Sequence, residues 1–228
     1  MATPSRRERL REATAAEIKQ TARRLLVEGG LPAMSLRAIG REMGMTAPAI
    51  YRYFESLTDL TLALVVDLFG EMTAAVERAA AEHAGDPPLT RVGHMARAFR
   101  AWSLANRAEF GLVFGSPLPG LAERWSELDE GGARFCEAFF RVLDEQHAVQ
   151  PFEVELAGAA EMAHSFQPYF DAFGDRFPLP VVTQFVSCWA RVYGLIAMET
   201  FGQLHWAVTD AGPLFELELE RTLGTLAR

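Results

Sequence analysis

The sequence predicts an all-α protein. Half of its 228 residues are hydrophobic, enough for a sizeable core, and no segment alternates polar and apolar residues as a half-buried strand does. Apolar residues instead recur every three to four positions, in runs that glycine and proline separate. We therefore expect about nine to ten helices, comprising a three-helix N-terminal head, a long connecting helix and a helical body.

The head has the layout of a helix-turn-helix. Residues 12–28 are expected to form the first helix, which Gly29-Gly30 ends. Ser35 and Thr46 can each cap a further short helix. Gly44 lies between them and supplies a tight turn, because a residue without a β-carbon adopts a left-handed backbone most readily. In such a motif the second helix lies in the major groove of DNA.

The body follows a long helix. A capping pair, Ser56 with Asp59, begins a fourth helix over 57–82 that connects head and body. Glycine and proline then divide the chain into helices that we place around 92–104, 106–115, 121–143, 151–173, 180–204 and 214–226. An alternative is that Gly131-Gly132 interrupts the helix over 121–143.

Charge is distributed unevenly along the chain. Residues 1–60 hold 10 Lys and Arg against 7 Asp and Glu, a net charge of +3, and residues 61–228 carry −11. A positive segment can bind phosphate and an acidic one repels it, so DNA is expected to contact the N-terminal end alone. A chance distribution is the alternative explanation. The arginines of residues 1–11 form either a flexible basic arm or a solvated terminus.

The second helix of the motif carries the candidate DNA contacts. Its leading turn has small residues that permit close approach to bases, and its end offers hydroxyl and guanidinium groups for phosphate. Ile50 and Phe54 are expected to face inward. The alternatives are that the tyrosines are core residues and that the arginine of the preceding helix is merely solvated. The expected DNA contacts are Arg37, Thr46, Ala47, Pro48, Ala49, Tyr51, Arg52 and Tyr53.

An aromatic-rich run, a short polar stretch and a leucine follow the glycine turn. The pattern consists of Leu36, Ile39, Gly44, Met45, Ala49, Ile50, Tyr51, Tyr53, Phe54, Ser56 and Leu60. With it, this fifth of the chain resembles the DNA-binding domain of the TetR family of transcriptional repressors. Members often have a phosphate-binding lysine at the start of the fourth helix, where this chain has Leu57 with Glu55 nearby. We therefore expect weaker DNA binding, or a stronger need for low salt.

The resemblance implies a ligand-responsive repressor that is not an enzyme. Its expected partners are double-stranded DNA with a palindromic operator, a small apolar or aromatic effector, and a second copy of the chain. We divide the chain into the arm over 1–11, the helix-turn-helix domain over 12–57, and an effector-binding and dimerisation domain over 58–228. An effector would displace the long fourth helix and so change the separation of the two heads.

The segment 180–198 predicts dimerisation. Arg191 is its one charged residue, and a helix that is apolar on every side must be buried on every side. We expect it to pack inward on one side and against a symmetry mate on the other, a large monomeric core being the alternative. Trp189, Gly194 and Glu199 resemble a C-terminal subtype of the family named for a Trp-His-Gly signature, with Tyr193 in place of its histidine.

Aromatic residues are abundant in the body. They could line an apolar cavity between helices, where the resemblance implies an effector site. For each one singly, ordinary core packing is the simpler interpretation. His164, Gln167 and Tyr193 are candidate polar anchors. The candidate lining consists of Trp102, Phe110, Phe114, Phe139, Met162, Phe166, Tyr169, Trp189 and Tyr193.

Other function classes have weaker support. Glu161-x-x-His164 has the spacing of a di-iron ligand pair, but no second copy exists, so we expect no cofactor and no metal. Cys136 and Cys188 are far apart in apolar patterns, which indicates buried thiols in a reducing compartment. Without an apolar signal core or a membrane span, we expect a cytoplasmic protein. A helical metal enzyme, or a small-molecule carrier without a DNA role, is the alternative.

Overall fold

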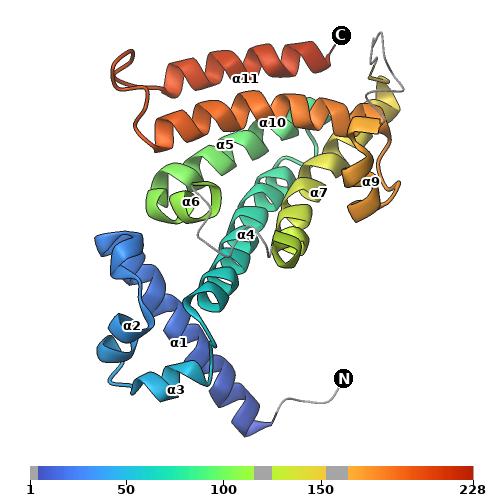
Figure 1. Ribbon diagram of the computed structural model, residues 1–228. Helices are drawn as coiled ribbons and strands as arrows, with labels where there is room; N and C mark the ends of the chain where they lie inside the picture. The colour runs from blue at the N-terminus through green and yellow to red at the C-terminus, as the bar shows by residue number, and fades with distance from the viewer. Residues whose placement is uncertain (1–4, 116–124, 153–163, 228) are drawn as a thin grey trace. The chain divides into compact units, whose positions relative to one another are not determined.

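The computed structural model describes residues 5–115, 125–152 and 164–227. Within these ranges the chain forms ten α-helices and no strand, so the expected all-α class is confirmed (Figure 1). A single 3₁₀ turn, Leu31–Ala33, joins the first two helices. The helices are α1 Arg6–Gly29, α2 Leu36–Glu42, α3 Ala47–Tyr51, α4 Leu57–Glu82, α5 Pro88–Ala105, α6 Arg107–Phe114, α7 Trp125–Val149, α9 Gln167–Phe173, α10 Leu179–Thr200 and α11 Gly212–Leu226.

Helix α1 begins six residues earlier than expected. The Ser5 hydroxyl accepts a hydrogen bond from the Glu8 backbone N–H at 3.2 Å, and the Glu8 carboxylate accepts one from the Ser5 N–H at 2.6 Å. This reciprocal capping box satisfies two N–H groups at the start of the helix. The expectation of a flexible arm over 1–11 is therefore wrong for its arginines, which lie on the first two turns of α1.

Two further expectations need correction. Helix α7 continues through Gly131-Gly132 without the interruption that those glycines suggested. In the expected helix over 151–173, the structure gives α9 over Gln167–Phe173, and residues 153–163 lie outside the described residues.

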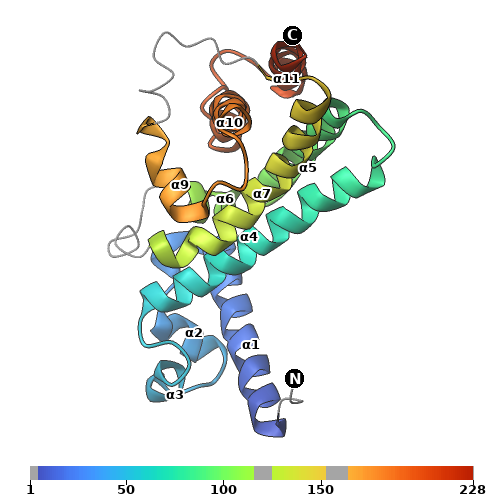
Figure 2. The same cartoon turned by 90° about the vertical axis from the view of Figure 1, so that its right-hand side faces the viewer.

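The chain divides into two compact units. The first comprises Met1–Phe69 and Asn106–Glu130, and the second comprises Gly70–Ala105 and Gly131–Arg228. In the first unit, α1 packs against α2 and α6, and α2 packs against α3 (Figures 1 and 2). Its core is built from one apolar face of each helix and includes Ile18, Ala22, Leu26, Ile39, Ile50 and Leu60. Helix α4 is continuous and belongs to the first unit up to Phe69.

In the second unit, α10 packs against α5 and α11, and α11 also packs against α5 (Figures 1 and 2). Aromatic rings fill the space between α5, α7 and α10. The ring centroid of Phe99 lies 5.2 Å from that of Phe135 and 5.4 Å from that of Trp189. The guanidinium of Arg100 on α5 donates to both carboxylate oxygens of Glu199 on α10, at 2.7 and 2.6 Å. These contacts fix α10 against α5 within the unit.

Helix α10 is, among the described residues, long and apolar enough to cross a membrane, although only 22% of its most apolar stretch is buried within the single chain. Length and composition do not distinguish a membrane span from a helix at a protein interface. Near its C-terminal end, α10 forms an ion pair with a neighbouring helix of the same chain, between Glu199 and Arg100 of α5. Much of the apolar surface of α10 is uncovered in the single chain.

Candidate DNA-binding surface and effector cavity

The turn between α2 and α3 is built from local interactions. The Ser35 hydroxyl accepts a hydrogen bond from the Ala38 N–H at 3.2 Å and so caps α2. Gly44 has a φ of 63°, the left-handed backbone expected for this position. The Met45 N–H then donates to the Gly40 carbonyl at 2.8 Å, which closes the turn. The sequence therefore determines the angle at which α3 leaves α2.

Gly40 is a second glycine that the turn requires, and the sequence pattern did not single it out. A β-carbon at this position would lie 3.0 Å from the Met45 carbonyl oxygen and 3.5 Å from Cγ1 of Ile50. The first distance is shorter than an ordinary van der Waals contact, so any larger residue would push the turn or α3 away. Gly40 thus allows α3 to pack closely against α2.

Helix α3 has one buried side and one solvent-facing side. Ile50 is fully buried, whereas Tyr51 beside it is 52% exposed. Thr46, Pro48 and Arg52 are exposed. Among the described backbone groups of α3, none donates a capping hydrogen bond to the Thr46 side chain, so this hydroxyl remains available to another partner.

The remaining expected DNA contacts are less uniformly placed. Arg37 on α2 is exposed, and Ala49 and Tyr53 are half-buried. Phe54, which was expected to face fully inward, is also half-buried. Ala47 is the first residue of α3, and its side chain is not among those that the structure describes.

A basic groove lies between the start of α1 and the end of α3. It is open, has a volume of about 720 Å³, and is lined by Ser5, Arg7, Glu8, Leu10, Arg11, Arg52 and Tyr53. Three of these residues are arginines and one is a glutamate. The lining side chains therefore carry a net charge of +2. Such a surface suits an anionic polymer.

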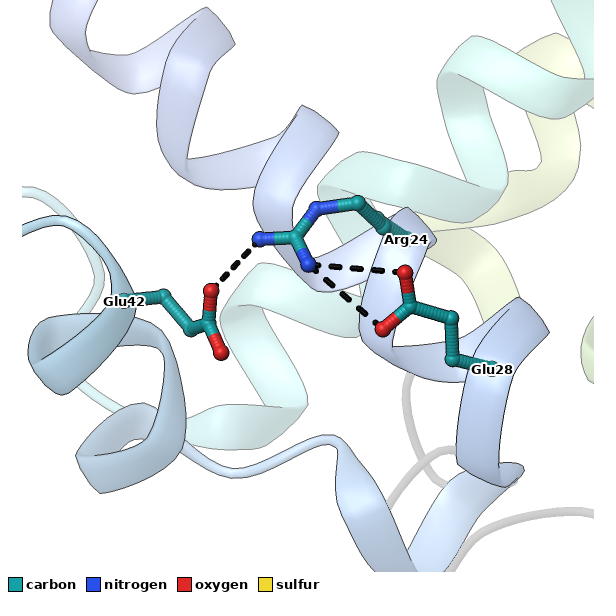
Figure 3. Close-up of polar contacts among 3 residues, drawn as sticks. All are labelled: Arg24, Glu28 and Glu42. Atoms are coloured by element: carbon teal, nitrogen blue, oxygen red, sulfur yellow. Dashed lines mark hydrogen bonds and ion pairs between the residues drawn. The ribbon is translucent and has the colours of Figure 1, made fainter.

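An ion-pair cluster holds the C-terminal end of α2 against α1 (Figure 3). Arg24 on α1 donates to Glu42, the last residue of α2, at 2.7 Å, and lies 3.5 Å from Glu28 on its own helix. The hydrogen bond from Arg24, supported by its charge, lowers the pKa of Glu42, and the same pair raises the pKa of Arg24. Both partners therefore stay ionised, and Arg24 neutralises an acidic group on the helix that precedes α3.

Two ion pairs fix α1 to the other helices of the first unit. Lys19 lies 2.5 Å from Asp67 on α4. Arg23 donates to Glu109 on α6 at 2.9 Å and to Asn106 at 3.1 Å. The Glu109 side chain is only 6% exposed, so this pair is desolvated on its acidic side. A movement of α4 or α6 would thus be transmitted to α1.

The second unit contains a narrow apolar cavity of about 40 Å³. None of the described residues that line it is charged, and only Cys188, Trp189 and Thr222 have a side chain with a heteroatom. Burial raises the pKa of the Cys188 thiol to about 11, and that of Cys136 to about 12. Both thiols are therefore neutral at physiological pH. The lining consists of Val92, Ala96, Phe99, Phe139, Leu143, Phe185, Cys188, Trp189, Val192, Leu219, Thr222, Leu223 and Leu226.

The structure brings together only part of the expected lining. Phe139 and Trp189 line the cavity, and Tyr193 stacks on Trp189 with centroids 5.0 Å apart. Phe110 and Phe114 instead belong to the first unit, where Phe114 packs on Phe69 of α4. Abundance of aromatic residues identified the core but not which helices share a cavity.

The other candidates lie elsewhere. Trp102 and Phe166 are half-buried, and the Tyr169 ring packs on Phe140 at 5.6 Å. Met162 lies outside the described residues. Of the three expected polar anchors, His164 is exposed and Gln167 is exposed and bonded to Asp171, whereas Tyr193 is half-buried and stacks on Trp189.

Helix α11 supplies cavity residues that were missed, among them Leu219, Leu223 and Leu226. Their spacing of three to four residues was visible as an amphipathic pattern. The pattern gives the buried face of α11 but not its neighbours. The contact with α5 and α10 is a tertiary property of the fold.

Two family models match the chain. Residues 18–64 match the bacterial regulatory proteins of the tetR family, and residues 92–222 match the tetracyclin repressor-like C-terminal domain. The first match covers the turn between α2 and α3 and its flanks, and the second covers most of α5 to α11. The second description names no Trp-His-Gly subtype, so that assignment stays a prediction.

Known proteins of the same length are similar throughout. The HTH-type transcriptional regulator Rv1816 of Mycobacterium tuberculosis is 32% identical over 219 residues, which cover 95% of this chain and 94% of that protein. The solved structure of the regulatory protein SCO4313 matches with a TM-score of 0.78 and 29% identity, over 97% of this chain and 100% of that chain. A TetR/AcrR-family regulator from Thermobifida fusca shares the fold, with a TM-score of 0.59 and 21% identity over 92% and 97% of the two chains.

Proteins of this kind are DNA-binding regulators rather than enzymes, and they dimerise. Double-stranded DNA and a second copy of the chain are accordingly its partners. Both family models and a relative that spans nearly the whole length agree, and the chain belongs to the TetR family of transcriptional regulators.

Proposed function

We propose that the protein is a cytoplasmic repressor that binds a palindromic operator as a dimer and is released by a small apolar or aromatic effector. The observation that carries the DNA-binding part is the two-sided character of α3. Buried Ile50 anchors the helix, while Tyr51 and Arg52 next to it are exposed. A short helix with this arrangement is suited to the major groove.

We assign the DNA contacts to α3 and its neighbours. Small exposed residues at the start of α3 approach the bases, and the tyrosine and arginine side chains bind phosphate. The arginines at the start of α1 add to the basic groove beside Arg52. The assigned contacts are Arg37, Thr46, Ala47, Pro48, Ala49, Tyr51, Arg52 and Tyr53, within the domain 12–57.

We assign effector binding to the cavity between α5, α7, α10 and α11, in the domain 58–228. Its apolar lining favours an apolar or aromatic compound, and the ring of Tyr193 stacks on the lining residue Trp189. Pockets for drug-sized ligands measure about 300–1,000 Å³, far more than the cavity of about 40 Å³. An effector must therefore open the space, and it shifts the protein toward an expanded state only as far as it prefers that state.

We assign the uncovered surface of α10 and α11 to dimerisation. Val186 and Met198 on α10 and Leu217 on α11 are large apolar side chains that solvent reaches in the single chain. Large exposed apolar patches commonly mark protein interfaces, and we propose that these side chains form part of one. In a twofold dimer the same helices of the two copies would cover one another.

Coupling between effector and DNA uses the continuity of the helices. The second half of α4 belongs to the second unit, and its first half is tied to α1 through Asp67 and Lys19. Helix α6 follows α5 after a single residue, Asn106, and is tied to α1 through Glu109 and Arg23. Opening the cavity moves α5, and through these connections it displaces the heads from operator spacing.

The test is operator binding by full-length variants, measured by fluorescence anisotropy on DNA from the region upstream of the protein's own gene. Tyr51→Phe and Arg52→Ala should weaken binding while leaving the dimer intact in light scattering. Each cationic side chain that binds a phosphate adds about 1 to the slope of log affinity against log salt concentration. Arg52→Ala removes one such side chain from each copy of the dimer, so it should also lower that slope by about 2.

The matched control is Arg141→Ala. Arg141 is an exposed arginine on α7 whose ion pair is with Glu137 of the same helix, and α7 is assigned neither to DNA contact nor to dimerisation, so its removal should leave DNA affinity unchanged. Equal affinities of the wild type, Tyr51→Phe and Arg52→Ala proteins would contradict the assigned contacts. A chain that binds effector but no DNA would instead support the small-molecule carrier.

A further inference from the structure

Three titratable side chains meet at the connection between α4 and α5. His83 directly follows α4, Asp86 lies in the turn, and His94 lies on the second turn of α5. His83 Nδ1 is 3.0 Å from Asp86 Oδ2, and His94 Nε2 is 3.8 Å from the same oxygen. One possible ligand atom from each residue lies within 4.8 Å of the other two, and all three residues are half-buried.

The geometry points to a binding site for a divalent transition-metal ion, with zinc as the best-suited ion, held by His83, Asp86 and His94. This site goes beyond the proposed function, because neither DNA binding nor the effector cavity uses any of these residues. All three belong to the second unit.

The spacing of the ligand atoms is close to what zinc requires. Zinc–nitrogen and zinc–oxygen bonds of about 2.0–2.2 Å in a tetrahedron place neighbouring ligand atoms about 3.3–3.5 Å apart. The two separations from Asp86 Oδ2, 3.0 and 3.8 Å, lie on either side of this value. Movements of a few tenths of an ångström in half-exposed side chains bring both nitrogens to bonding distance of an ion beside the carboxylate.

The two imidazole rings need one further adjustment. They stack in parallel, with centroids 3.5 Å apart and planes within 2° of each other. A nitrogen lone pair lies in the plane of its ring, so binding one ion tilts the two planes toward each other. Rotation about the terminal side-chain bond is soft for histidine, which makes this tilt accessible.

The chemistry of the three groups selects the class of ion. Two imidazoles with one carboxylate suit zinc, copper and nickel, whereas calcium and magnesium prefer oxygen ligands throughout. The site also follows the C-terminal end of α4, a helix of 26 residues whose last carbonyl groups favour a positive charge nearby. Three protein ligands leave a fourth position for water.

The backbone that carries the ligands is already fixed by the turn before an ion binds. The Asp86 N–H donates to the His83 carbonyl at 2.9 Å, and the Arg91 N–H donates to the Pro87 carbonyl at 3.1 Å as α5 begins. A bound ion would add a cross-link between the end of α4 and the second turn of α5. We expect it to reduce opening of this connection and to raise the thermal stability of the second unit.

The experiment uses tag-free, full-length protein treated with a chelator and then dialysed. Zinc sulfate is titrated in by calorimetry, with no DNA or effector present. The expected result is one zinc ion per chain, with affinity lowered at least about tenfold in His83→Ala, Asp86→Asn and His94→Ala. Zinc should raise the melting temperature of the wild type but not of His94→Ala.

His205→Ala is the matched control. His205 is an exposed histidine in another segment, where its ring lies 2.7 Å from the Gly202 carbonyl, and its removal should leave zinc affinity unchanged. Substitution by cobalt should give a visible spectrum without a thiolate charge-transfer band. Absence of saturable binding, equal affinity in His83→Ala and His94→Ala, or a thiolate band from Cys136 or Cys188 would each overturn the site. Because this assay contains no DNA, its failure leaves the repressor function untouched.

Discussion

The size of the cavity gives a quantitative prediction for Val92→Ile. Val92 lies on α5, is buried, and lines the cavity. The free space of about 40 Å³ is slightly more than the volume of one water molecule, about 30 Å³, so one additional methylene fits without overpacking. Isoleucine has the same branching at the β-carbon as valine, so helix propensity changes little.

Two estimates of the stability gain agree. Burying one methylene contributes about 0.8 kcal/mol. Filling a cavity of about 40 Å³ at about 24 cal/mol per Å³ contributes at most about 1 kcal/mol. The melting temperature should therefore rise by about 2–4 °C for a chain of this size. Because the proposed effector site is this same space, the effector concentration that releases DNA should rise about fourfold.

Differential scanning calorimetry measures the first effect, and effector titration of the protein–operator complex measures the second. Val149→Ile is the control, because Val149 is largely exposed at the end of α7 and adds no methylene to the cavity. A stabilised Val92→Ile protein with an unchanged effector response would refute the cavity as the effector site. A destabilised protein would show that the space is not free.

Three further predictions concern other parts of the molecule. Gly40→Ala should weaken operator binding and destabilise the first unit by about 1–2 kcal/mol in denaturant melts, because the new β-carbon contacts the backbone of the turn too closely. Unchanged DNA affinity would show that α3 can shift without affecting DNA binding. Glu109→Ala should destabilise the protein by about 3 kcal/mol, since it leaves Arg23 without its buried carboxylate, and a change below about 1 kcal/mol would indicate that solvent compensates. Burial raises the pKa of Cys136 from 9.0 to about 12 and that of Cys188 from 9.0 to about 11. Above pH 9 the unfolded state therefore releases thiol protons that the folded state still holds. The free energy of unfolding is unaffected by these thiols below pH 9 and decreases as the pH rises from 9 through 11–12. The melting temperature should accordingly fall less steeply in this range for a variant with both cysteines changed to alanine.

Local signals predicted the elements of the first unit well. The limits of α4 agree with the expectation because its start is a local signal: the Ser56 hydroxyl accepts a hydrogen bond from the Asp59 N–H at 3.1 Å and donates to the Asp59 carboxylate at 2.7 Å. The same kind of pair, Ser5 with Glu8, was present at the start of α1. It was overlooked because the arginines between them suggested a solvated arm.

Tertiary relations could not be inferred from the same patterns. Gly40 is required because a β-carbon there would lie only 3.0 Å from the Met45 carbonyl oxygen across the turn. This distance depends on the folded backbone and cannot be predicted from the spacing of residues along the chain. His83 and His94 are eleven positions apart, and they meet because the connection between α4 and α5 reverses the chain within five residues. Composition thus indicates which residues are buried, whereas only the packing of helices decides which of them share a site.

The uncharged lining of the small cavity has a consequence for the range of compounds that the repressor would detect. Thr222, Cys188 and Trp189 are the only described lining residues that carry a heteroatom, so few directional bonds are available to distinguish one apolar molecule from another. Apolar contacts distinguish compounds that differ by one methylene by only about 1–3 kcal/mol. The protein would then respond to the hydrophobicity and size of a compound, and chemically unrelated inducers would rank in the order of their partition coefficients between an apolar solvent and water.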